Sequence, residues 1–289
     1  EFGLFARFDA VNILKKNLAT ILTTLGLDHL DWLPKNKKNI DGIIFEKTSS
    51  LLNSKIIVSK QNDKKTLEKI KDSLNTNNSK KIFFDNLFSY TLSENDFFYY
   101  EDQYGGLKLP MPNLKGEFQL SNVTAAIATI RNIEELKVSE ENIKKGITKI
   151  KSIARLQEIK NGKLKNLIKN NKLFIDGSHN PLGARVLADY LDTLNCKKHM
   201  ILGMMLNKDH KEYISYFKGK INSLTTIDIP NQKNAIERNE LKNKLKLEGL
   251  KIDSKPSIKE AISSIPIKDN EIILITGSLY LMGEVLNLN

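Results

Sequence analysis

Short apolar runs alternate with amphipathic stretches through the second half of the chain, and this rhythm constrains the fold more than any other feature. In chain order they are strand 173–176, helix 181–194, strand 199–204, helix 208–219, strand 224–229, helices 237–248 and 257–265, and strand 271–276. Strand and helix in alternation predict a parallel sheet covered by helices, a Rossmann-like α/β layer. Ligands of such sheets bind at the carboxyl ends of the strands.

The first half of the chain is less regular. Residues 18–25 and 56–58 have the composition of buried strands. Residues 60–104 are rich first in Lys, Asn and Ser and then in aromatic side chains, which indicates a linking helix and edge strands. Gly105-Gly106 and Pro110-Met111-Pro112 predict turns that close this region.

Two amphipathic helices are predicted before the chain enters its regular half. The first has apolar positions at helical spacing between Val123 and Ile133. The second opens at Ser139, a good N-cap, and has apolar positions from Ile143 to Ile150.

The length of the chain favours two domains. Its 289 residues exceed the usual size of one domain. The change in pattern places the boundary between Ile150 and Arg155, which predicts domains at 1–152 and 153–289.

The basic composition has little bearing on function. The formal charge is +11, but 40 Lys, 5 Arg and 30 Asn are scattered along the chain. Nucleic-acid-binding proteins usually cluster Arg and Lys with aromatic side chains on one element, so nucleic-acid binding stays an alternative only.

No apolar run approaches the roughly 18 residues of a membrane helix, and no signal peptide is recognisable. With Cys196 as the single cysteine, we expect a reducing, cytoplasmic setting and no membrane partner. Glu1 in place of Met indicates a processed or truncated product.

The hexapeptide Asp176-Gly177-Ser178-His179-Asn180-Pro181 is the sharpest local signal. It places an acid at the end of a strand and a His in the turn before a helix N-terminus. Backbone N–H groups and the helix dipole favour phosphate there. The alternative is an ordinary turn in which Asp and Asn serve as cap residues and the His is exposed.

A second polar cluster, Asp28-His29-Leu30-Asp31, follows the first predicted strand. Carboxylate and imidazole groups suit a hydrated divalent cation. The alternative is a capped turn in solvent.

Several segments taken together resemble folylpolyglutamate synthase, which is often bifunctional with dihydrofolate synthase, in the Mur ligase superfamily. The matching segments are Glu1–Asn12, Leu25–Leu33, Glu46-Lys47, Gln119–Asn122, Ala154–Gln157, Asp176–Pro181, Gly203 with Lys208-Asp209, and Thr276–Val285. They run in the same order over the whole chain. The resemblance implies an α/β fold: the C-terminal part of a Mur ligase central ATPase domain, followed by a Rossmann-like Mur ligase C-terminal domain.

The resemblance also implies an ATP-dependent amide ligase of folate biosynthesis. ATP would phosphorylate a carboxylate of folate or dihydropteroate, and the amine of L-glutamate would attack the acyl phosphate. Magnesium and cationic groups would spread the charge of the transferring phosphoryl group. Closure of the two domains on ATP would exclude water. The implied partners are these small molecules, with no nucleic acid or membrane, and the implied state is a monomer.

Two magnesium sites are implied by the resemblance. Glu1 and His29 would ligate magnesium, and a carbamylated Lys47 would supply a carboxylate to the second ion. Three consecutive residues match the stretch that borders the folate site, namely Phe8, Asp9 and Ala10.

The remaining implied site residues belong to the nucleotide. Asn122 would touch the adenine side, and Arg155 and Asp176 would reach ATP from the second domain. His179 would lie near the phosphates or the acyl phosphate, so Lys47 and His179 are the candidate catalytic residues.

The chain departs from the family pattern in several places. It contains no Gly-rich loop ending in Gly-Lys-Ser or Gly-Lys-Thr, which family members carry upstream of the matching segment. Phe5-Ala6 replaces Gly-Gly, Ile153-Ala154 replaces Pro-Gly, Thr48-Ser49-Ser50 replaces small residues, and Phe118 replaces a frequent His. Each swap adds side chains where the backbone needs room or unusual dihedrals.

Three hypotheses about function remain after the family resemblance and the missing P-loop are considered. The first is a working ligase whose P-loop lies upstream or on a separate polypeptide. The second is a non-catalytic remnant of that enzyme. The third, from another class, is a basic nucleic-acid-binding protein. A sister Mur ligase with another acyl substrate is a further alternative, because Asp-x-x-His-Asn-Pro turns recur across the superfamily.

Overall fold

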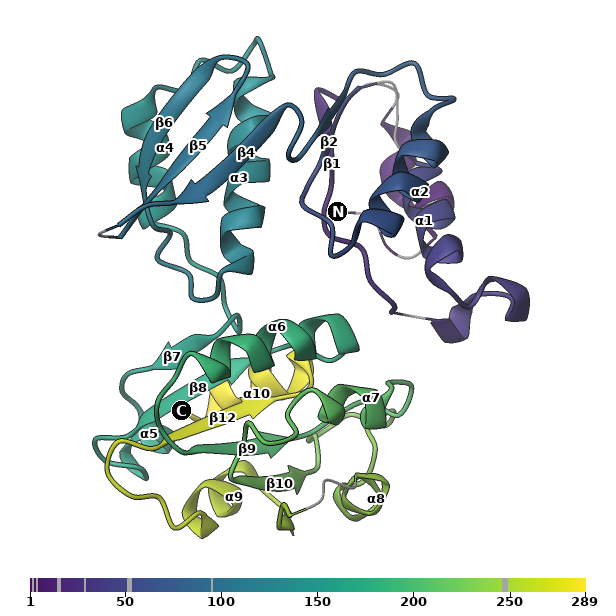
Figure 1. Cartoon of the computed structure of the whole chain (residues 1–289). Helices are drawn as coiled ribbons and strands as arrows, with labels where there is room; N and C mark the ends of the chain where they lie inside the picture. Colours follow the sequence, from purple (N-terminus) through teal and green to yellow (C-terminus); the bar gives the residue numbers. More distant parts are fainter. Residues whose placement is uncertain are drawn as a thin grey trace. The chain divides into compact units, whose positions relative to one another are not determined.

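The computed structural model describes residues 1, 3, 5–14, 17–28, 30–50, 54–94, 96–245 and 249–289. The chain divides into two compact units (Figure 1). Unit 1 comprises Glu1–Asn113 and Glu117–Lys151, and unit 2 comprises Leu114–Gly116 and Ser152–Asn289. No helix in the described part of the chain is long and apolar enough to cross a membrane.

Unit 1 contains a three-stranded parallel sheet in the order β1 (Ala19–Leu22), β2 (Lys55–Val58), β3 (Lys81–Phe83). Helices α1 (Ile40–Thr48) and α2 (Lys64–Leu74) pack on it around one apolar cluster. The cluster is made of Leu22, Leu25, Ile44, Ile56, Val58, Ile70 and Leu74. The prediction of a buried strand over 18–25 was too long, because only four residues pair with β2 and Leu18 and Ile21 are exposed.

Unit 1 also contains a three-stranded antiparallel sheet, from β4 (Phe88–Leu92), β5 (Phe97–Asp102) and β6 (Gly105–Pro110). The prediction that Gly105-Gly106 is a closing turn was wrong, because both glycines open β6 and pair with β5. The chain reverses one step earlier, where the Asp102 carboxylate accepts the Tyr104 N–H. Buried Leu107 and Leu109 alternate with exposed Lys108, which is the pattern of a strand, but the two glycines before them indicated a turn.

Two helices share an apolar cluster with this antiparallel sheet, α3 (Phe118–Arg131) and α4 (Glu140–Thr148). The α3 helix begins five residues before the first predicted apolar position, Val123. Ser139 caps α4 as predicted, because its side chain accepts the Asn142 N–H. The helix ends at Thr148, short of Ile150.

Unit 2 is built on a six-stranded sheet in the order β11-β10-β9-β12-β8-β7. Its strands are β7 (Gln157–Ile159), β8 (Lys172–Asp176), β9 (Lys198–Leu202), β10 (Ser223–Ile227), β11 (Ile252–Lys255) and β12 (Ile272–Thr276). All neighbours are parallel except β7 and β8. The four predicted strands are therefore confirmed, while β7 and β11 are short, partly polar edge strands that the apolar pattern missed.

The helices of unit 2 alternate with these strands, which confirms the predicted α/β fold class. They are α5 (Lys163–Asn166), α6 (Pro181–Asp192), α7 (His210–Ser215), α8 (Arg238–Lys244), α9 (Ile258–Ser264) and α10 (Leu279–Leu288). The predicted helix over 208–219 is only six residues long, because Asp209 caps it and the chain turns before Gly219 at positive φ. The end of the predicted helix 237–248 lies outside the described residues beyond Leu245.

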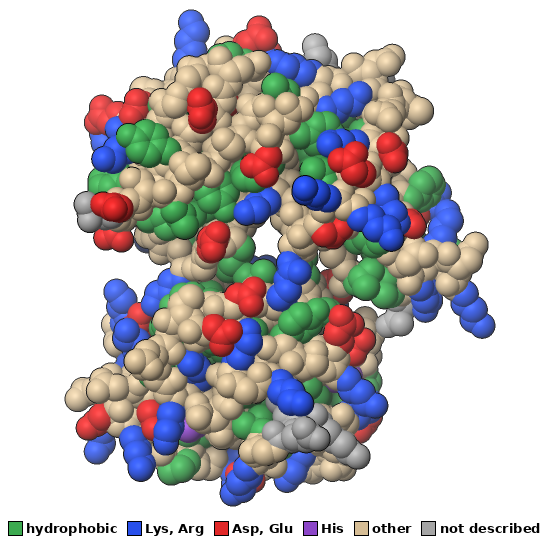
Figure 2. Space-filling model, viewed as in Figure 1, with side chains coloured by type: hydrophobic (Ala, Val, Ile, Leu, Met, Phe, Trp, Pro, Cys, Tyr) green, Lys and Arg blue, Asp and Glu red, His purple; other side chains and the backbone are tan. Residues whose placement is uncertain are grey.

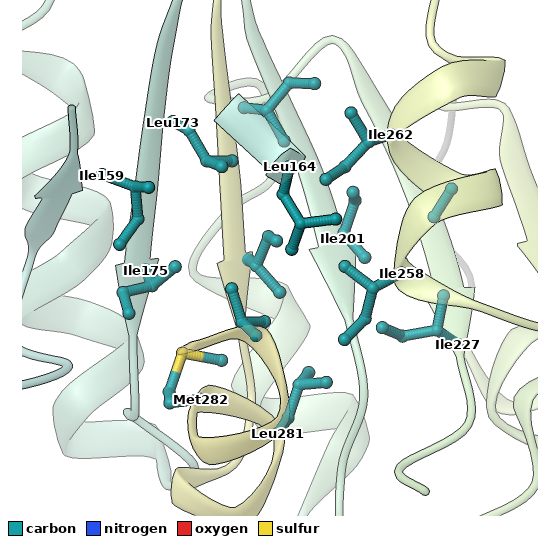
Figure 3. Close-up of a cluster of buried hydrophobic side chains, with 14 of the residues drawn as sticks. Ile159, Leu164, Leu173, Ile175, Ile201, Ile227, Ile258, Ile262, Leu281 and Met282 are labelled. Atoms are coloured by element: carbon teal, nitrogen blue, oxygen red, sulfur yellow. The ribbon is translucent and has the colours of Figure 1, made fainter. Parts of the chain in front are cut away.

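One face of this sheet carries the main core of unit 2. Figure 3 shows strand side chains such as Leu173, Ile175 and Ile201 facing Ile258 of α9 and Leu281 of α10. Each fully buried Leu or Ile side chain contributes roughly 1.5–3 kcal/mol by removal from water. This core fixes the strand ends on which the candidate site depends.

Charged side chains are interspersed over the surface. On the face shown in Figure 2, Lys and Arg side chains lie among Asp and Glu side chains on both units. This mixture agrees with the scattered Lys residues of the sequence.

Candidate functional site

Asp176, the last residue of β8, holds two loops of unit 2 together. Its side chain is only 5% exposed. One carboxylate oxygen, Oδ1, accepts the Ser178 N–H at 2.8 Å, and Oδ2 accepts the Leu156 N–H at 2.8 Å. A buried carboxylate is tolerated where such hydrogen bonds replace water. Asp176 therefore fixes the candidate turn and the segment that contains Arg155.

The segment around Arg155 has an unusual backbone. Ala154 and Leu156 both adopt positive φ, +57° and +46°, which L-residues other than Asn and Asp rarely do. The Ala154 carbonyl accepts the Gly177 N–H at 2.8 Å, so the strained segment is attached directly to the turn. The unusual dihedral expected where Ala154 replaces a family glycine is present.

Gly177 allows this close approach. A Cβ atom on Gly177 would come within 2.3 Å of Leu279 Cδ2 and 3.4 Å of Arg155 Nη1. Real Cβ atoms do not come as near as the first distance, so Gly177 leaves room for a side chain that begins α10. The structure thus brings Arg155 and Asp176 to the same turn, at the carboxyl end of β8.

His179 and Asn180 form the start of α6. Asn180 caps the helix by accepting the Gly183 N–H at 2.8 Å, and Pro181 is the first helical residue, both as predicted. His179 is half-buried, and its Nδ1 lies 3.0 Å from the Gly177 carbonyl. Because a carbonyl only accepts, Nδ1 is the donor. The arrangement offers a phosphate the Arg155 cation, an imidazole and the N-terminus of a twelve-residue helix.

Lys47 lies in the last turn of α1 in unit 1. Its Nζ donates a hydrogen bond to the Gly3 carbonyl at 2.9 Å. Burial lowers the pKa of Lys47, while the nearby charges of Glu1, Asp28 and Asp9 act in the opposite direction. A lowered pKa increases the fraction of neutral amine, which is the form that reacts with carbon dioxide.

Phe8, Asp9 and Ala10 lie in the same part of unit 1. Asp9 caps the 3₁₀ helix Ala10–Ile13 through the Val11 N–H, and its other carboxylate oxygen accepts the Gly3 N–H at 2.8 Å. These backbone hydrogen bonds lower the pKa of Asp9. Phe8 is 74% exposed, and Ala10 is exposed. The structure therefore gathers Glu1, the predicted folate-side stretch and Lys47 in one region.

A pair that the sequence reasoning missed holds this region. Arg7 makes two hydrogen bonds to Glu46, Nε to Oε2 at 3.0 Å and Nη2 to Oε1 at 3.1 Å. Glu46 is buried, and the Arg7 guanidinium lies 4.2 Å from the centre of the Phe8 ring. Glu46 occupies a buried position of α1 next to Lys47, where an acid requires a partner, but this burial is visible only in the folded chain.

Asn122 and His29 complete the predicted set. Asn122 is exposed on α3, and its Nδ2 donates to Gln119 Oε1 at 3.1 Å. His29 lies outside the described residues. Among the residues that are described, no three His, Cys, Asp or Glu side chains are grouped so that they could hold a metal ion.

The donors near Lys47 nevertheless fit magnesium if Lys47 is carbamylated. Magnesium keeps several waters and is usually bound through one or two carboxylates. The Glu1 carboxylate lies near enough for its charge to act on Lys47, and a carbamate on Lys47 would place a second carboxylate beside it.

Comparison with known proteins finds a family match within unit 2. Residues 155–279 match the family model described as Mur ligase, glutamate ligase domain. The matched range begins at Arg155 and contains Asp176 and His179. Most of unit 2 is therefore similar to the glutamate ligase domain of Mur ligases.

The whole chain is similar to dihydrofolate synthase/folylpolyglutamate synthases, which confirms the resemblance predicted from the sequence. The Haemophilus influenzae enzyme is 23% identical over 98% of this chain and 66% of its own length. The Escherichia coli enzyme is 25% identical over 76% of this chain and 48% of its own length. The chain thus spans two thirds or less of the length of these relatives.

Solved structures show the same fold. Escherichia coli FolC superposes with a TM-score of 0.81 at 23% identity, covering 99% of this chain and 64% of that chain. The bifunctional folylpolyglutamate synthase/dihydrofolate synthase of Yersinia pestis gives a TM-score of 0.81 at 20% identity, with 99% and 64% covered.

Proposed function

We propose that this chain carries nucleotide-, folate- and metal-binding residues of an ATP-dependent amide ligase of the dihydrofolate synthase/folylpolyglutamate synthase type. The observation that supports it most is the turn after β8, where Arg155, His179 and the N-terminus of α6 converge within the residues that match the Mur ligase glutamate ligase domain. Three chemical features that suit a phosphate thus share one strand end.

The proposed reaction has two steps. A carboxylate oxygen of folate or dihydropteroate attacks the γ-phosphorus of ATP, which gives an acyl phosphate and ADP. The amine of L-glutamate then attacks the acyl carbon, phosphate leaves, the amine loses a proton, and an amide forms. Arg155 would stabilise charge on the phosphoryl oxygens, and His179 would lie beside them.

Asp176 has a different part in this proposal. Its carboxylate oxygens each hold a backbone N–H, from Leu156 and from Ser178. We assign it the role of orienting Arg155 and the turn. Asn122 would contact the adenine side from α3.

In unit 1, Glu1, His29 and a carbamylated Lys47 would hold magnesium, which supplies charge neutralisation for the phosphoryl group. The Gly3 carbonyl and the neighbouring carboxylates orient the Lys47 amine. Phe8, Asp9 and Ala10 would border the folate, with Phe8 presenting an exposed aromatic ring for stacking.

What the relatives bind agrees with this proposal. Escherichia coli FolC has been solved in complex with DHPP and ADP. The Yersinia pestis enzyme has been solved with AMPPNP and Mn ion. A bifunctional folylpolyglutamate synthase/dihydrofolate synthase that is 20% identical to this chain has been solved with Mn, AMPPNP and L-glutamate bound.

The first test is nucleotide binding by the full chain, measured by isothermal titration calorimetry with Mg·ADP. We expect saturable binding that Arg155→Ala abolishes or weakens at least tenfold. Arg185→Ala is the matched control, because Arg185 lies on α6 outside the turn. A wild-type chain that binds no Mg·ADP would contradict the proposal, as would equal affinities in both variants.

The second test is turnover. ATP-dependent joining of radiolabelled L-glutamate to dihydropteroate or a reduced folate is measured with and without a P-loop polypeptide added as a separate chain. These 289 residues contain no Gly-Lys-Ser or Gly-Lys-Thr, so we expect turnover only with the addition. Binding without turnover in either arm would favour the non-catalytic remnant.

A further inference from the structure

Three hydroxyl groups form a closed ring beneath the turn that carries His179. The Tyr213 hydroxyl lies 3.0 Å from Ser178 Oγ and 2.9 Å from Thr276 Oγ1. Ser178 Oγ and Thr276 Oγ1 are 3.3 Å apart. Thr276 ends β12, and Ser178 follows the end of the adjacent strand β8, so the ring lies at the carboxyl edge of the sheet.

The three hydroxyl groups of the ring can hydrogen-bond to one another without water. Each hydroxyl has one proton to donate and lone pairs to accept, so three hydroxyls in a triangle can each donate once and accept once. Tyr213 and Thr276 are fully buried. Burial raises the pKa of Tyr213, so the phenol keeps its proton throughout the physiological range. The Tyr213 ring is packed in turn against Phe217, with ring centres 5.5 Å apart.

Ser178 is the member that connects the ring to the candidate site. It directly precedes His179, and its backbone N–H is bound to Asp176. Its carbonyl oxygen also lies 3.3 Å from the Tyr213 hydroxyl. A Cβ atom on Gly183 would come within 2.8 Å of Ser178 Cβ, so the first turn of α6 packs tightly on the same residue.

Thr276 connects the ring to a second turn. The Gly203 N–H donates to the Thr276 carbonyl, and Ser278, two residues later, caps α10. The ring therefore links α7, which carries Tyr213, to the turns that begin α6 and α10.

We propose that Tyr213 is a positioning residue that acts through Ser178 to hold His179 and the N-terminus of α6 in place for the phosphates. The proposal rests on the proposed function of this turn. Tyr213 touches no reacting atom, and its hydroxyl sets the geometry of the residues that do. Hydroxyl networks of this kind act as a unit, so the loss of one member is felt by the others.

The decisive test uses Tyr213→Phe, which removes only the hydroxyl. Tyr216→Phe is the matched control, since Tyr216 lies just after α7, half-buried and outside the ring. The readout is the His179 ring signal in NMR spectra of the full chain, assigned by its loss in His179→Gln. His199 is an internal reference at the amino ends of the strands.

We expect Tyr213→Phe to shift the His179 ring signal, while Tyr216→Phe leaves it unchanged. A His179 signal that is the same in wild type and Tyr213→Phe would overturn the proposal. The Ser178→Ala variant and the double variant provide a second measurement by urea unfolding. Non-additive effects are expected for a ring that acts as a unit, and additive effects would contradict a route through Ser178.

Nucleotide affinity separates this proposal from the function on which it rests. We expect Tyr213→Phe to weaken Mg·ADP binding about fivefold to tenfold, as the loss of one net hydrogen bond suggests, with Tyr216→Phe unchanged. A wild-type chain that binds no Mg·ADP would contradict the proposed function, whereas the His179 signal still decides whether Tyr213 positions the turn. Full affinity in Tyr213→Phe would overturn the proposal.

Discussion

Ala154→Gly tests whether the backbone beside Arg155 stores strain. Ala154 has φ +57°, and a left-handed conformation destabilises an L-residue by about 1–2 kcal/mol. Glycine would relieve this strain. Two losses oppose the gain. The first is the loss of the buried Ala154 methyl, which is 2% exposed within the core of unit 2, and the second is the conformational freedom of glycine in the unfolded chain. Removing a buried methyl costs about 0.8 kcal/mol, and the greater freedom of glycine in the unfolded chain costs about 0.4–1 kcal/mol.

The expected result is a near balance, so Ala154→Gly should lie within about 1 kcal/mol of the wild-type stability. Ala261→Gly is the matched control, because Ala261 is buried in the same core but lies in helix α9. It loses the methyl and about 1 kcal/mol of helix propensity with no strain to relieve, which sums to roughly 2 kcal/mol.

Amide hydrogen exchange of strands β8 and β12 is the assay, because both alanines pack in the core beneath these strands and the readout is specific to unit 2. The free energies of opening should differ between the two variants by about 1–2 kcal/mol. Equal destabilisation by Ala154→Gly and Ala261→Gly would refute the claim that the dihedral at Ala154 is strained.

Two further outcomes are expected. Gly177→Ala places a Cβ atom 2.3 Å from Leu279 Cδ2, so the free energy of unfolding, measured by thermal unfolding, should fall by roughly 1–3 kcal/mol. The additional substitution Leu279→Ala should partly restore it. An unchanged melting temperature in Gly177→Ala would contradict the close approach. For Lys47, whose pKa is lowered by burial, the neutral amine and hence the carbamate should increase as pH rises through that lowered pKa. A ¹³C NMR signal from labelled carbon dioxide should therefore grow with pH in wild type and be absent in Lys47→Arg, and a signal of equal size in both would exclude Lys47 as the carbamylated residue.

The strands and caps of unit 2 were readable from the sequence because each depends on neighbours in the chain. Strands β8, β9 and β12 are buried on both faces, so they appear as continuous apolar runs. Asn180 and Pro181 predict the start of α6, because their side chains favour the N-cap and the first helical position. The hydroxyl ring was not readable, because Tyr213 meets Ser178 and Thr276 only after three strands have come together.

Unit 1 was harder to predict because its structure depends on residues that are far apart in the chain. Its strands are short, and β1 leaves Ile21 exposed, so the length of the apolar run overstated the length of the strand. The two glycines before Leu107 gave a turn signal, but cross-strand pairing with β5 decided their conformation. Arg7 and Glu46 are 39 residues apart, and pairing at that separation has no local signature.

Asp176 shows why a match to a family motif leaves the role of a residue open. An ionised carboxylate offers about four acceptor positions, and two of them are filled here by the N–H groups of Leu156 and Ser178. The same side chain therefore builds the turn before any ligand arrives. Replacing it would release the segment of Arg155 and the turn of His179 together, so a loss of nucleotide affinity in such a variant would not identify a contact. Arg155 is the sharper probe of nucleotide binding, because its guanidinium lies beside Gly177 and the backbone hydrogen bonds that shape the turn come from other residues.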